Sequence, residues 1–331
     1  MATKLKFGLL LPHFGEYASV ERCIEGSKKA EEYGFDSVWV RDHLVFEPHG
    51  MEGEDNTHIE GLLILAAIAS VCKKLTLGTG TVIAHRHPIH LAQVMAGLST
   101  LCDGKVIMGL GLGTFQHEFA AAGYPNTLQD RANLARINSE LCRRLWKGEK
   151  VTYKDQYFDF ADVELKPQPK NMIPIWYGGG TPASCRRASE YCDGWMPGRI
   201  PMATFIKMVN YLRENYQAQG RPMGTVGAIP ILSIDKDLDT ALSKVNTKGL
   251  INEGNNPSKK TWVRPASGKF STYEDIRGLL LAGKPEDVVK DTKEYEKNGL
   301  NHIVYDLRFR YADWYQQIDY LGKEVLPAMR S

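Results

Sequence analysis

The sequence lacks long apolar runs and lacks an excess of charge of either sign. Its 41 basic and 39 acidic residues give a formal net charge of +2, which offers no attraction to nucleic acid or to an anionic membrane. No apolar stretch approaches the roughly 20 residues that span a bilayer. The short apolar run near the N-terminus has no cleavage pattern of a signal peptide. We therefore expect neither a membrane protein nor a nucleic-acid-binding protein.

The cysteines lack the spacing of a zinc site or of a CxxC motif. Most of them lie in apolar helical contexts, where a buried free thiol is the common state. We expect free thiols, no bound metal and a reducing, cytoplasmic setting. The six positions are 23, 72, 102, 142, 185 and 192.

Apolar strands and amphipathic helices alternate along the chain, without a fixed-period repeat or a low-complexity segment. Eight strands, each followed by a helix, predict a (β/α)8 TIM barrel, formed as a single domain over residues 1–331. A doubly wound sheet, the alternative, usually has fewer strands and two domains. We expect the strands at 5–12, 36–40, 75–84, 105–113, 173–180, 193–198, 225–234 and 302–307.

Several of the helices between these strands carry start or stop signals. Ser19 is a possible N-cap of the first helix, and Gly34 is its expected C-terminal stop. The stretch "VTYKDQYFDF" predicts a hairpin, and "DWYQQIDYLGKEVLPAMR" predicts one closing helix. We expect the other helices at 59–72, 87–102, 128–148, 182–192, 203–219 and 285–299.

One segment after the seventh strand interrupts the alternation. Residues 252–272, "NEGNNPSKKTWVRPASGKFST", are rich in Gly, Asn, Pro, Ser and Lys. Such an insertion is typical of a mobile lid over a barrel's active site. The alternative is a passive surface insertion.

Glycines cluster at the end of the fourth strand, in "KVIMGLGLGTFQHEF" (105–119). A dinucleotide fingerprint would need GxGxxG opening a helix in the first βαβ unit, followed by an acidic residue about 20 positions later. Here the pattern is GxGxG in the fourth unit. In a barrel, Gly111 and Gly113 would instead let a flat ligand lie against the backbone at the catalytic mouth. The stretch "LGTG" (77–80) repeats this feature at the third strand.

The loop "YGGGTPAS" (177–184) has the chemistry of a phosphate site. Its glycines expose backbone N–H groups, its hydroxyls add donors, and a helix N-terminus follows directly. A tight strand-to-helix turn without a ligand is the alternative. The residues expected to bind phosphate are Gly178, Gly179, Gly180, Thr181 and Ser184.

These motifs, in this order and spacing, resemble the bacterial luciferase-like superfamily, whose barrels use FMN or the deazaflavin F420. The resemblance runs from residue 6 to about 198 and resumes at "GKPEDVVKDTKEYEKNGLNHIVYDL" and "EVLP". The motifs before residue 198 are "FGLLLP", "AEEYGFDSVWVRDH", "LTLGTGTVIAHRHPIHLA", "DGKVIMGLGLG", "HEFAAAGYP", "RRLWKGEKVTY" and "PIWYGGGTPASCRRASEYCDGWM".

The resemblance implies where the catalytic residues lie. The motif "VRDH" places Asp42 and His43 at the barrel mouth beside the isoalloxazine, and a histidine at this position takes part in the chemistry of relatives. An imidazole can donate or accept a proton near neutral pH. A structural histidine at a strand end is the alternative for His43.

The stretch "GTGT" matches a bulge in the third strand where relatives often hold a cis peptide behind the flavin ring. We expect that bond at Gly80–Thr81 or one bond earlier. The cofactor contacts implied here are Gly78, Thr79, Gly80 and Thr81.

Two enzyme activities and one non-catalytic function fit this resemblance. The first is an F420-dependent oxidoreductase that transfers hydride between the cofactor and a small organic substrate, with His43 moving the proton. The second is a two-component monooxygenase that uses FMNH2 from a partner reductase. The third is a non-catalytic relative that binds flavin or a pigment. The motifs look most like those of F420-type members.

Other residues bear on the ligand. Arg86, Arg187 and Arg199 are candidates for binding the polyanionic tail of F420. Thr114 stands where the sugar-phosphate dehydrogenase branch has a glutamate, with Glu118 only later, which argues against a sugar-phosphate substrate. Trp39 and Trp176 are candidate core residues, whereas Trp195 is a candidate pocket residue. The apolar helices at 59–72 and 90–102 fit the homodimer interface that the resemblance implies. They fit equally well as ordinary helices that pack against the barrel.

Overall fold

Eight parallel strands close into a barrel in the computed structural model, which describes residues 4–48 and 52–331. The ring closes between its first and last strands, where Lys6 pairs with His302 and Leu10 with Asp306. The predicted (β/α)8 barrel is confirmed. In order around the ring, the strands are β1 (Lys6–Leu10), β2 (Ser37–Val40), β3 (Thr76–Thr79), β5 (Val106–Gly111), β8 (Ile175–Gly178), β9 (Gly194–Met196), β10 (Thr225–Ala228) and β13 (His302–Asp306).

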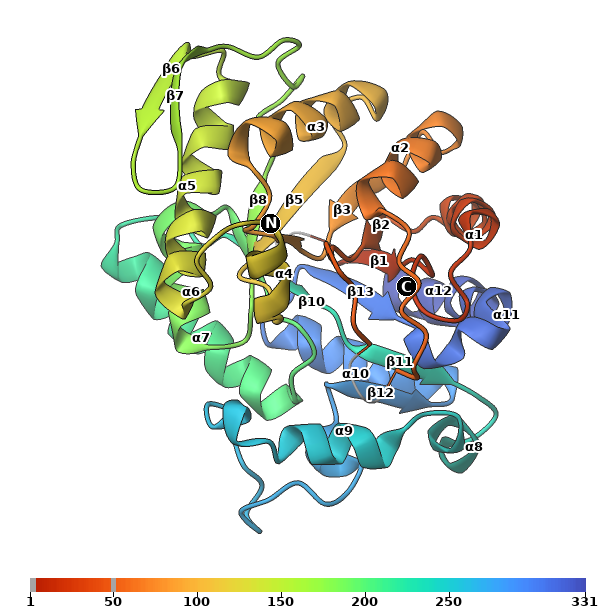
Figure 1. The fold of residues 1–331 in the computed structure, drawn as a ribbon. Coiled ribbons are helices and arrows are strands. Elements are labelled where there is room, and N and C mark those ends of the chain that lie inside the picture. Colours follow the sequence, from red (N-terminus) through yellow and green to blue (C-terminus); the bar gives the residue numbers. More distant parts are fainter. Residues whose placement is uncertain (1–3, 49–51) are drawn as a thin grey trace.

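Helices surround the central strands (Figure 1). The first helix begins where Ser19 accepts the N–H of Arg22 and ends at Gly34, whose φ of 80° is the left-handed conformation that glycine adopts at low cost. The helices of the outer ring are α1 (Val20–Tyr33), α2 (Gly61–Val71), α3 (Pro88–Leu101), α5 (Leu128–Trp146), α6 (Pro182–Tyr191), α7 (Met202–Ala218), α10 (Pro285–Lys297), α11 (Trp314–Tyr320) and α12 (Leu326–Arg330).

Aromatic side chains fill the barrel interior. The rings of Trp39 and Trp176 lie with centroids 5.5 Å apart, and His302 meets both edge-on. Gly78 makes room for this cluster, since a Cβ there would lie 2.3 Å from the Trp39 ring. The expectation that Trp39 and Trp176 are core residues is therefore confirmed.

Two predicted strands are wrong in detail. The segment 225–234 forms two strands, β10 and β11 (Ile231–Ile234), because Pro230 between them has no N–H to donate to a neighbour. The segment 75–84 likewise divides into β3 and β4 (Val82–Ile83). A further strand, β12 (Leu280–Gly283), was not expected, and it pairs in parallel with β11.

The outer edge of β12 is covered by a side chain. The Tyr273 hydroxyl accepts the N–H of Ala282 at 3.1 Å and donates to the Ala282 carbonyl at 3.3 Å. These are the two groups that a neighbouring strand would use. Among the described residues, no strand other than β11 pairs with β12.

Two segments extend from the barrel on opposite sides (Figure 1). The expected hairpin is present as β6 (Val151–Lys154) and β7 (Asp159–Val163), which are antiparallel. On the other side lie α8 (Leu238–Ser243) and α9 (Thr247–Gly254). The predicted insertion 252–272 begins within α9 and continues through the short turn Pro257–Lys259. Its mobility remains a prediction.

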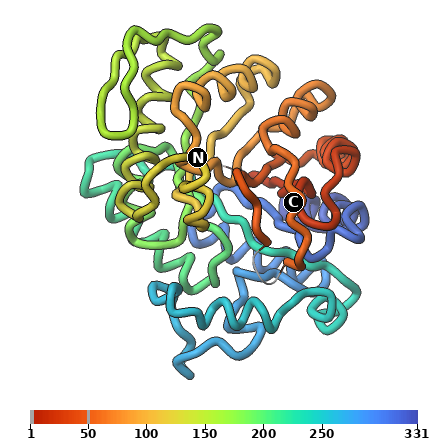
Figure 2. The backbone as a smooth tube through the Cα atoms, in the orientation of Figure 1, coloured from red at the N-terminus to blue at the C-terminus, as the bar shows by residue number. Residues whose placement is uncertain are grey.

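The C-terminus returns to the first helix. Arg330 of α12 donates to the carbonyl of Gly34 at 2.6 Å, and the chain traces in Figure 2 run close together there. The predicted closing helix is present and runs from Trp314 to Arg330, with a π-helical turn, Leu321–Val325, between α11 and α12. No helix in the described part of the chain is long and apolar enough to cross a membrane.

Candidate functional site

A cavity of about 510 Å³ opens at the carboxyl ends of the barrel strands. This is the end at which (β/α)8 barrels carry their ligands. Most of the predicted site residues come together in its wall, from the loops after β2, β3, β5 and β8. Those that line it are Asp42, His43, Gly80, Thr81, Gly111, Gly113, Gly178, Gly179, Thr181 and Ser184.

Backbone forms much of the cavity wall. The peptide bond Gly80–Thr81 is cis, at the position expected from the resemblance. A Cβ at Gly111 would lie 2.2 Å from the Thr81 Oγ1, and a Cβ at Gly178 would lie 2.8 Å from the Thr81 Cγ2. Glycine is therefore required at both positions, and together they leave a flat surface against which a planar ligand can lie.

Two predicted cofactor contacts lie behind this wall instead. Gly78 packs under Trp39. The Thr79 hydroxyl accepts the N–H of Gly109 at 2.9 Å and donates to its carbonyl at 3.1 Å, which ties β3 to β5. Neither residue is among those that line the cavity, so we correct their role from ligand contact to support of the strand.

The loop before α6 has the geometry of an anion site. Thr181 is the N-cap and accepts the N–H of Ser184 at 3.2 Å, and the two hydroxyl oxygens lie 2.9 Å apart. Gly179 has a φ of 114°, which a residue with a side chain rarely adopts. Arg187, within the same helix, also lines the cavity. The helix N-terminus and this guanidinium both attract an anion.

Two expectations about this region need correction. Gly180 lines a second cavity rather than the first. Trp195 is not a pocket residue, because its side chain is fully buried in the core. Its Nε1 donates to the carbonyl of Gly179 at 2.8 Å, so it holds the loop before α6 from behind.

His43 lies between an acidic side chain, Glu118, and a basic side chain, Arg41. Its Nδ1 is 3.3 Å from the Oε1 of Glu118, and its Nε2 is 3.3 Å from the Nη2 of Arg41. Arg41 and His43 both line the cavity. The sequence contained no signal that pairs Glu118 with His43, because 75 positions separate them and the contact depends on where α4 (Gln116–Ala121) packs.

The carboxylate of Asp42 is occupied by other protein groups. It accepts the backbone N–H of Ile83 at 2.8 Å and the Nε and Nη2 of Arg86 at 2.8 and 2.5 Å. Burial by itself would raise the pKa of Asp42, but the Arg86 and Ile83 interactions outweigh burial and lower it. Arg86 also contacts Glu60 at 2.8 Å. Arg86 therefore belongs to a structural ion pair and not, as suggested, to an anion-binding set.

A buried charge cluster lies beside His43. Arg199 lines the cavity and approaches the carboxylate of Asp306 at 3.3 Å, and Arg308 contacts the same carboxylate at 2.6 Å. Glu52 lies 3.5 Å from Arg41 and also pairs with Arg308. Three arginines thus face two carboxylates, which leaves this part of the wall electropositive.

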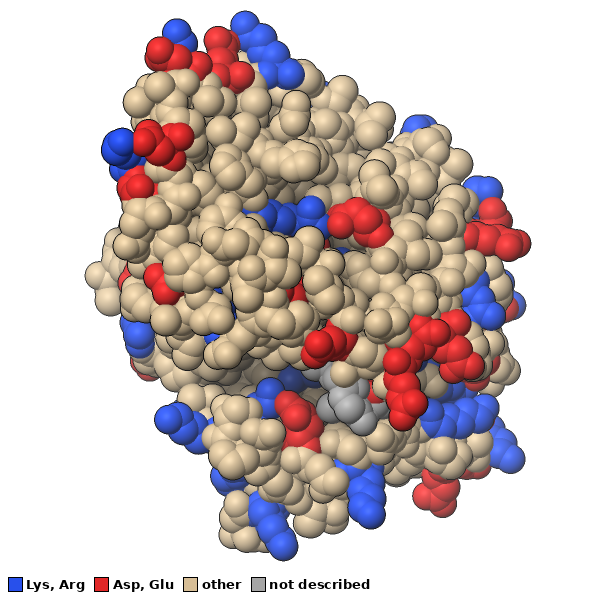
Figure 3. Space-filling model, viewed as in Figure 1, with Lys and Arg blue, Asp and Glu red and all other residues tan. Residues whose placement is uncertain are grey.

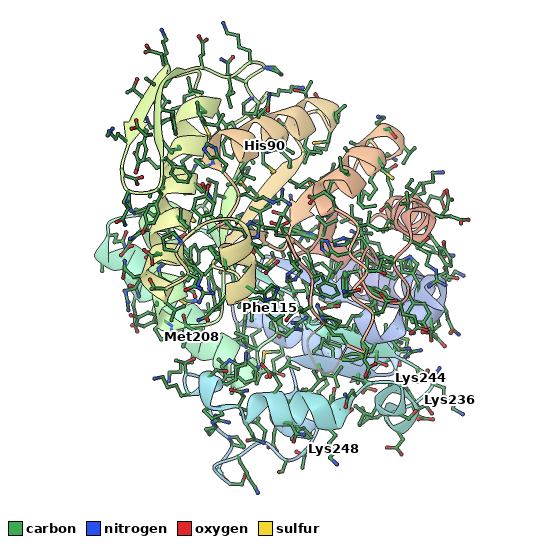
Figure 4. All side chains as sticks on the ribbon, viewed as in Figure 1. His90, Phe115, Met208, Lys236, Lys244 and Lys248 are labelled. Carbon is green, nitrogen blue, oxygen red and sulfur yellow. The ribbon has the colours of Figure 1, made fainter. Side chains whose placement is uncertain are left out.

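A second cavity of about 1000 Å³ adjoins the first and shares Thr114, Gly179, Thr181 and Arg199 with it. Its far side is formed by α9 and the turn after it, including Lys259 and Trp262. In the space-filling view a groove crosses the molecule above the part that holds α9, and basic and acidic atoms are mixed over the surface (Figure 3). Phe115, which lines this cavity, lies near the centre of the view at α4 (Figure 4).

Comparisons with known proteins identify relatives and structural neighbours of the chain. A curated relative, the F420-dependent glucose-6-phosphate dehydrogenase of Amycolatopsis mediterranei (strain U-32), is 28% identical over 93% of this chain and 94% of its own. A solved F420-dependent secondary alcohol dehydrogenase, in complex with an F420-acetone adduct, has a TM-score of 0.82 at 21% identity, covering 99% of this chain and 100% of its own.

A second solved structure, the oxygenating constituent of 3,6-diketocamphane monooxygenase from Pseudomonas putida in complex with FMN, has a TM-score of 0.79 at 17% identity, with 98% of each chain covered. At such low identities, the similarity to these two solved structures shows that the chain shares their fold. The sequence model that describes luciferase-like monooxygenases matches residues 5–302. The chain therefore belongs to the luciferase-like monooxygenase family.

Proposed function

We propose that this protein is an F420-dependent oxidoreductase that transfers hydride between the deazaflavin and a small organic substrate. One observation carries the proposal. A single cavity joins the flat, glycine-lined wall to the candidate anion site at the α6 N-terminus, and His43 lines the same cavity. The similarity to F420-dependent glucose-6-phosphate dehydrogenases supports F420 over FMN.

The residues present fit the chemical groups of such a cofactor. The surface formed by Gly80, Thr81 and Gly111 can accommodate a planar ring system. Thr181 and Ser184, with the α6 N-terminus, would hold its phosphate. Bound F420 would supply the hydride acceptor or donor.

His43 would move the proton that accompanies the hydride. When an alcohol is oxidised, its carbon loses a hydride to the cofactor and its hydroxyl loses a proton, which the imidazole accepts. In the reverse direction the imidazole returns that proton to the carbonyl oxygen. Asp42 would position this loop rather than take a proton itself, because its oxygens are already engaged by Arg86 and Ile83.

The substrate would enter from the second cavity. This cavity adjoins His43 through Phe115, whose ring centroid lies 5.7 Å from the imidazole. The segment 252–272 would act as its lid. Thr114 stands where the sugar-phosphate dehydrogenase branch has a glutamate, which favours an alcohol or carbonyl compound other than a sugar phosphate.

Titration of the purified protein with F420 and with FMN, each oxidised and reduced, tests this proposal. We expect saturable F420 binding with weak FMN binding, followed by cofactor-dependent oxidation of alcohols or reduction of carbonyls. Selective binding of reduced FMN with oxygen consumption would instead establish the alternative, a two-component monooxygenase served by a partner reductase. Binding of neither cofactor would contradict both.

Two further proposals concern the setting. We place the protein in the cytoplasm, because all six cysteines are free and buried. We also propose a homodimer formed through α2 and α3. The exposed Leu63 on α2 and Leu101 at the end of α3 support it, since they leave apolar surface at this face.

A further inference from the structure

A carboxylate outside the cavity contacts the histidine that lines it. The Glu118 side chain is fully buried on α4 and is not among the residues that line either cavity. A buried carboxylate is costly unless it is paired and hydrogen-bonded. The groups that Glu118 contacts therefore indicate its function.

Glu118 contacts one short segment, residues 43–45. Its Oε1 accepts the N–H of Leu44 at 2.7 Å and of Val45 at 3.3 Å, and it lies 3.3 Å from the Nδ1 of His43. Burial by itself would raise the pKa of Glu118, but the contacts with His43 and the two N–H groups lower it. Glu118 is therefore an ionised acceptor, which requires a proton on the Nδ1 of His43.

Arg41 fixes the other ring nitrogen. Its Nη2 lies 3.3 Å from the Nε2 of His43, and a guanidinium can donate but cannot accept. The imidazole thus satisfies both neighbours only when Nδ1 carries the proton and Nε2 carries the lone pair. Since Arg41 lines the cavity and Glu118 does not, Nε2 is the nitrogen on the cavity side.

We infer that Glu118 is a positioning residue that holds His43 in the Nδ1–H tautomer and keeps Nε2 as the atom that exchanges a proton with substrate. This inference rests on the proposed function. Once Nε2 has taken a proton, the ring is positive and faces Arg41, and the negative charge of Glu118 on the opposite side offsets that repulsion.

The other groups around His43 do not supply this charge. The rings of Phe46, Phe115 and His58 have centroids 5.2, 5.7 and 5.6 Å from the imidazole. Of these only His58 titrates, and burial is the main reason that its pKa is lowered to about 4. Among the described residues, Arg41 and Glu118 are thus the charged groups that contact the ring near neutral pH.

Replacing Glu118 by glutamine separates shape from charge. In E118Q the amide oxygen at the Oε1 position can still accept the N–H of Leu44 and a proton on Nδ1, but the negative charge is lost and the amide N–H₂ at the Oε2 position, 3.4 Å from Nδ1 in the wild type, is a donor. The preference of His43 for a proton on Nδ1 should therefore weaken. E118D retains the charge on a shorter side chain and should restore part of the wild-type behaviour.

Nitrogen NMR of the histidine-labelled, cofactor-free protein reads the tautomer without any activity. The protein has nine histidines, and the H43N variant identifies the signal of His43. We expect a protonated Nδ1 and an unprotonated Nε2 in the wild type at high pH, a smaller fraction of this tautomer in E118Q, and partial recovery in E118D. An unprotonated Nδ1 in the wild type would overturn the inference even if no variant folds.

H117N is the matched control. His117, the residue next to Glu118, donates to the carbonyl of Val45 at 3.1 Å and so contacts the 43–45 segment through its backbone. The H117N variant tests whether loosening the 43–45 segment is by itself sufficient to change the tautomer of His43. We expect the wild-type tautomer in H117N, and the tautomer change of E118Q in this control would contradict a charge-based role.

Kinetics provides the second readout. We expect kcat of E118Q to fall roughly 10- to 100-fold, which is part of the effect that general acid–base catalysis contributes. We expect KM to change little and the acid limb of the pH–rate profile to move to lower pH. If E118Q binds F420 normally and its pH profile and its His43 tautomer are unchanged, the inference about Glu118 is overturned but the proposed function is not. Absence of F420 binding by the wild type would overturn the proposed function, and the NMR result would still decide the tautomer.

Discussion

At the scale of single residues, neighbouring positions of one strand end have different roles. Asp42 is held by Arg86 and by the N–H of Ile83, whereas His43 lines the cavity with one nitrogen on the side of Arg41. The sequence predicts both as catalytic because it shows their order but not their partners. We therefore propose Asp42 as a support and His43 as the proton carrier.

Replacement of His43 by asparagine tests the proton carrier. We expect H43N to lose about 10²–10⁴-fold in kcat, because asparagine can occupy the position but cannot take up a proton near neutral pH. F420 affinity should change little, since the anion site lies at α6. Steady-state kinetics together with an F420 titration measure the two effects, and a variant with normal kcat would contradict the role of His43.

His302 in the barrel interior gives stability a pH dependence. Burial lowers its pKa to about 3, while an imidazole in the unfolded chain titrates near 6.5. The unfolded state therefore binds the proton first, so this contribution to stability is full above about pH 6.5 and is lost as the pH falls.

Urea unfolding at pH 7 and pH 5 measures this loss. The free energy of unfolding should decrease from pH 7 to pH 5, and His302 should account for about 2 kcal/mol of that decrease. The decrease should be smaller by this amount in H302N. H90N replaces an exposed histidine on α3 (Figure 4) and is the control. An equal decrease in wild type and H302N would contradict the assignment.

At the scale of secondary structure, the sequence predicts the barrel strands well because each strand is buried on both faces and appears as a short apolar run. It misses β12, whose run is equally apolar but follows a segment rich in loop-forming residues. It also misses the break at Pro230, where a single proline divides an otherwise continuous apolar stretch. Glycine clusters at strand ends reveal the cavity wall, whereas the ion pairs of Arg41, Arg199 and Glu118 depend on tertiary packing.

The turn before α6 can be tested by adding one methyl group. In G179A the new Cβ would lie 2.5 Å from the Ser184 Oγ, and the φ of 114° would be strained. We expect F420 affinity to fall at least tenfold, since a few kcal/mol of strain fall on the anion-binding loop. G97A, on α3 where no other atom lies within 4 Å, is the control. Equal F420 affinity in both variants would contradict an anion site at this loop.

At the scale of the whole molecule, the proposed homodimer depends on the face formed by α2 and α3. Leu63 on α2 is 68% exposed. We expect L63K to shift the protein from dimer to monomer in light-scattering measurements, because a buried lysine without a partner is costly at an interface. L128K changes another exposed leucine at the barrel mouth and should leave the dimer intact. A wild-type monomer would contradict the proposal.

The side-chain cover on β12 has a consequence for the behaviour of the protein at high concentration. The closed ring of eight strands has no open edge, whereas β12 lies outside the ring and has one side where an unprotected edge would permit strand addition between molecules. Tyr273 occupies the hydrogen-bonding groups of Ala282 there. Tyr273 thus leaves Ala282 without a free N–H or C=O for strand addition between molecules, an effect separate from catalysis.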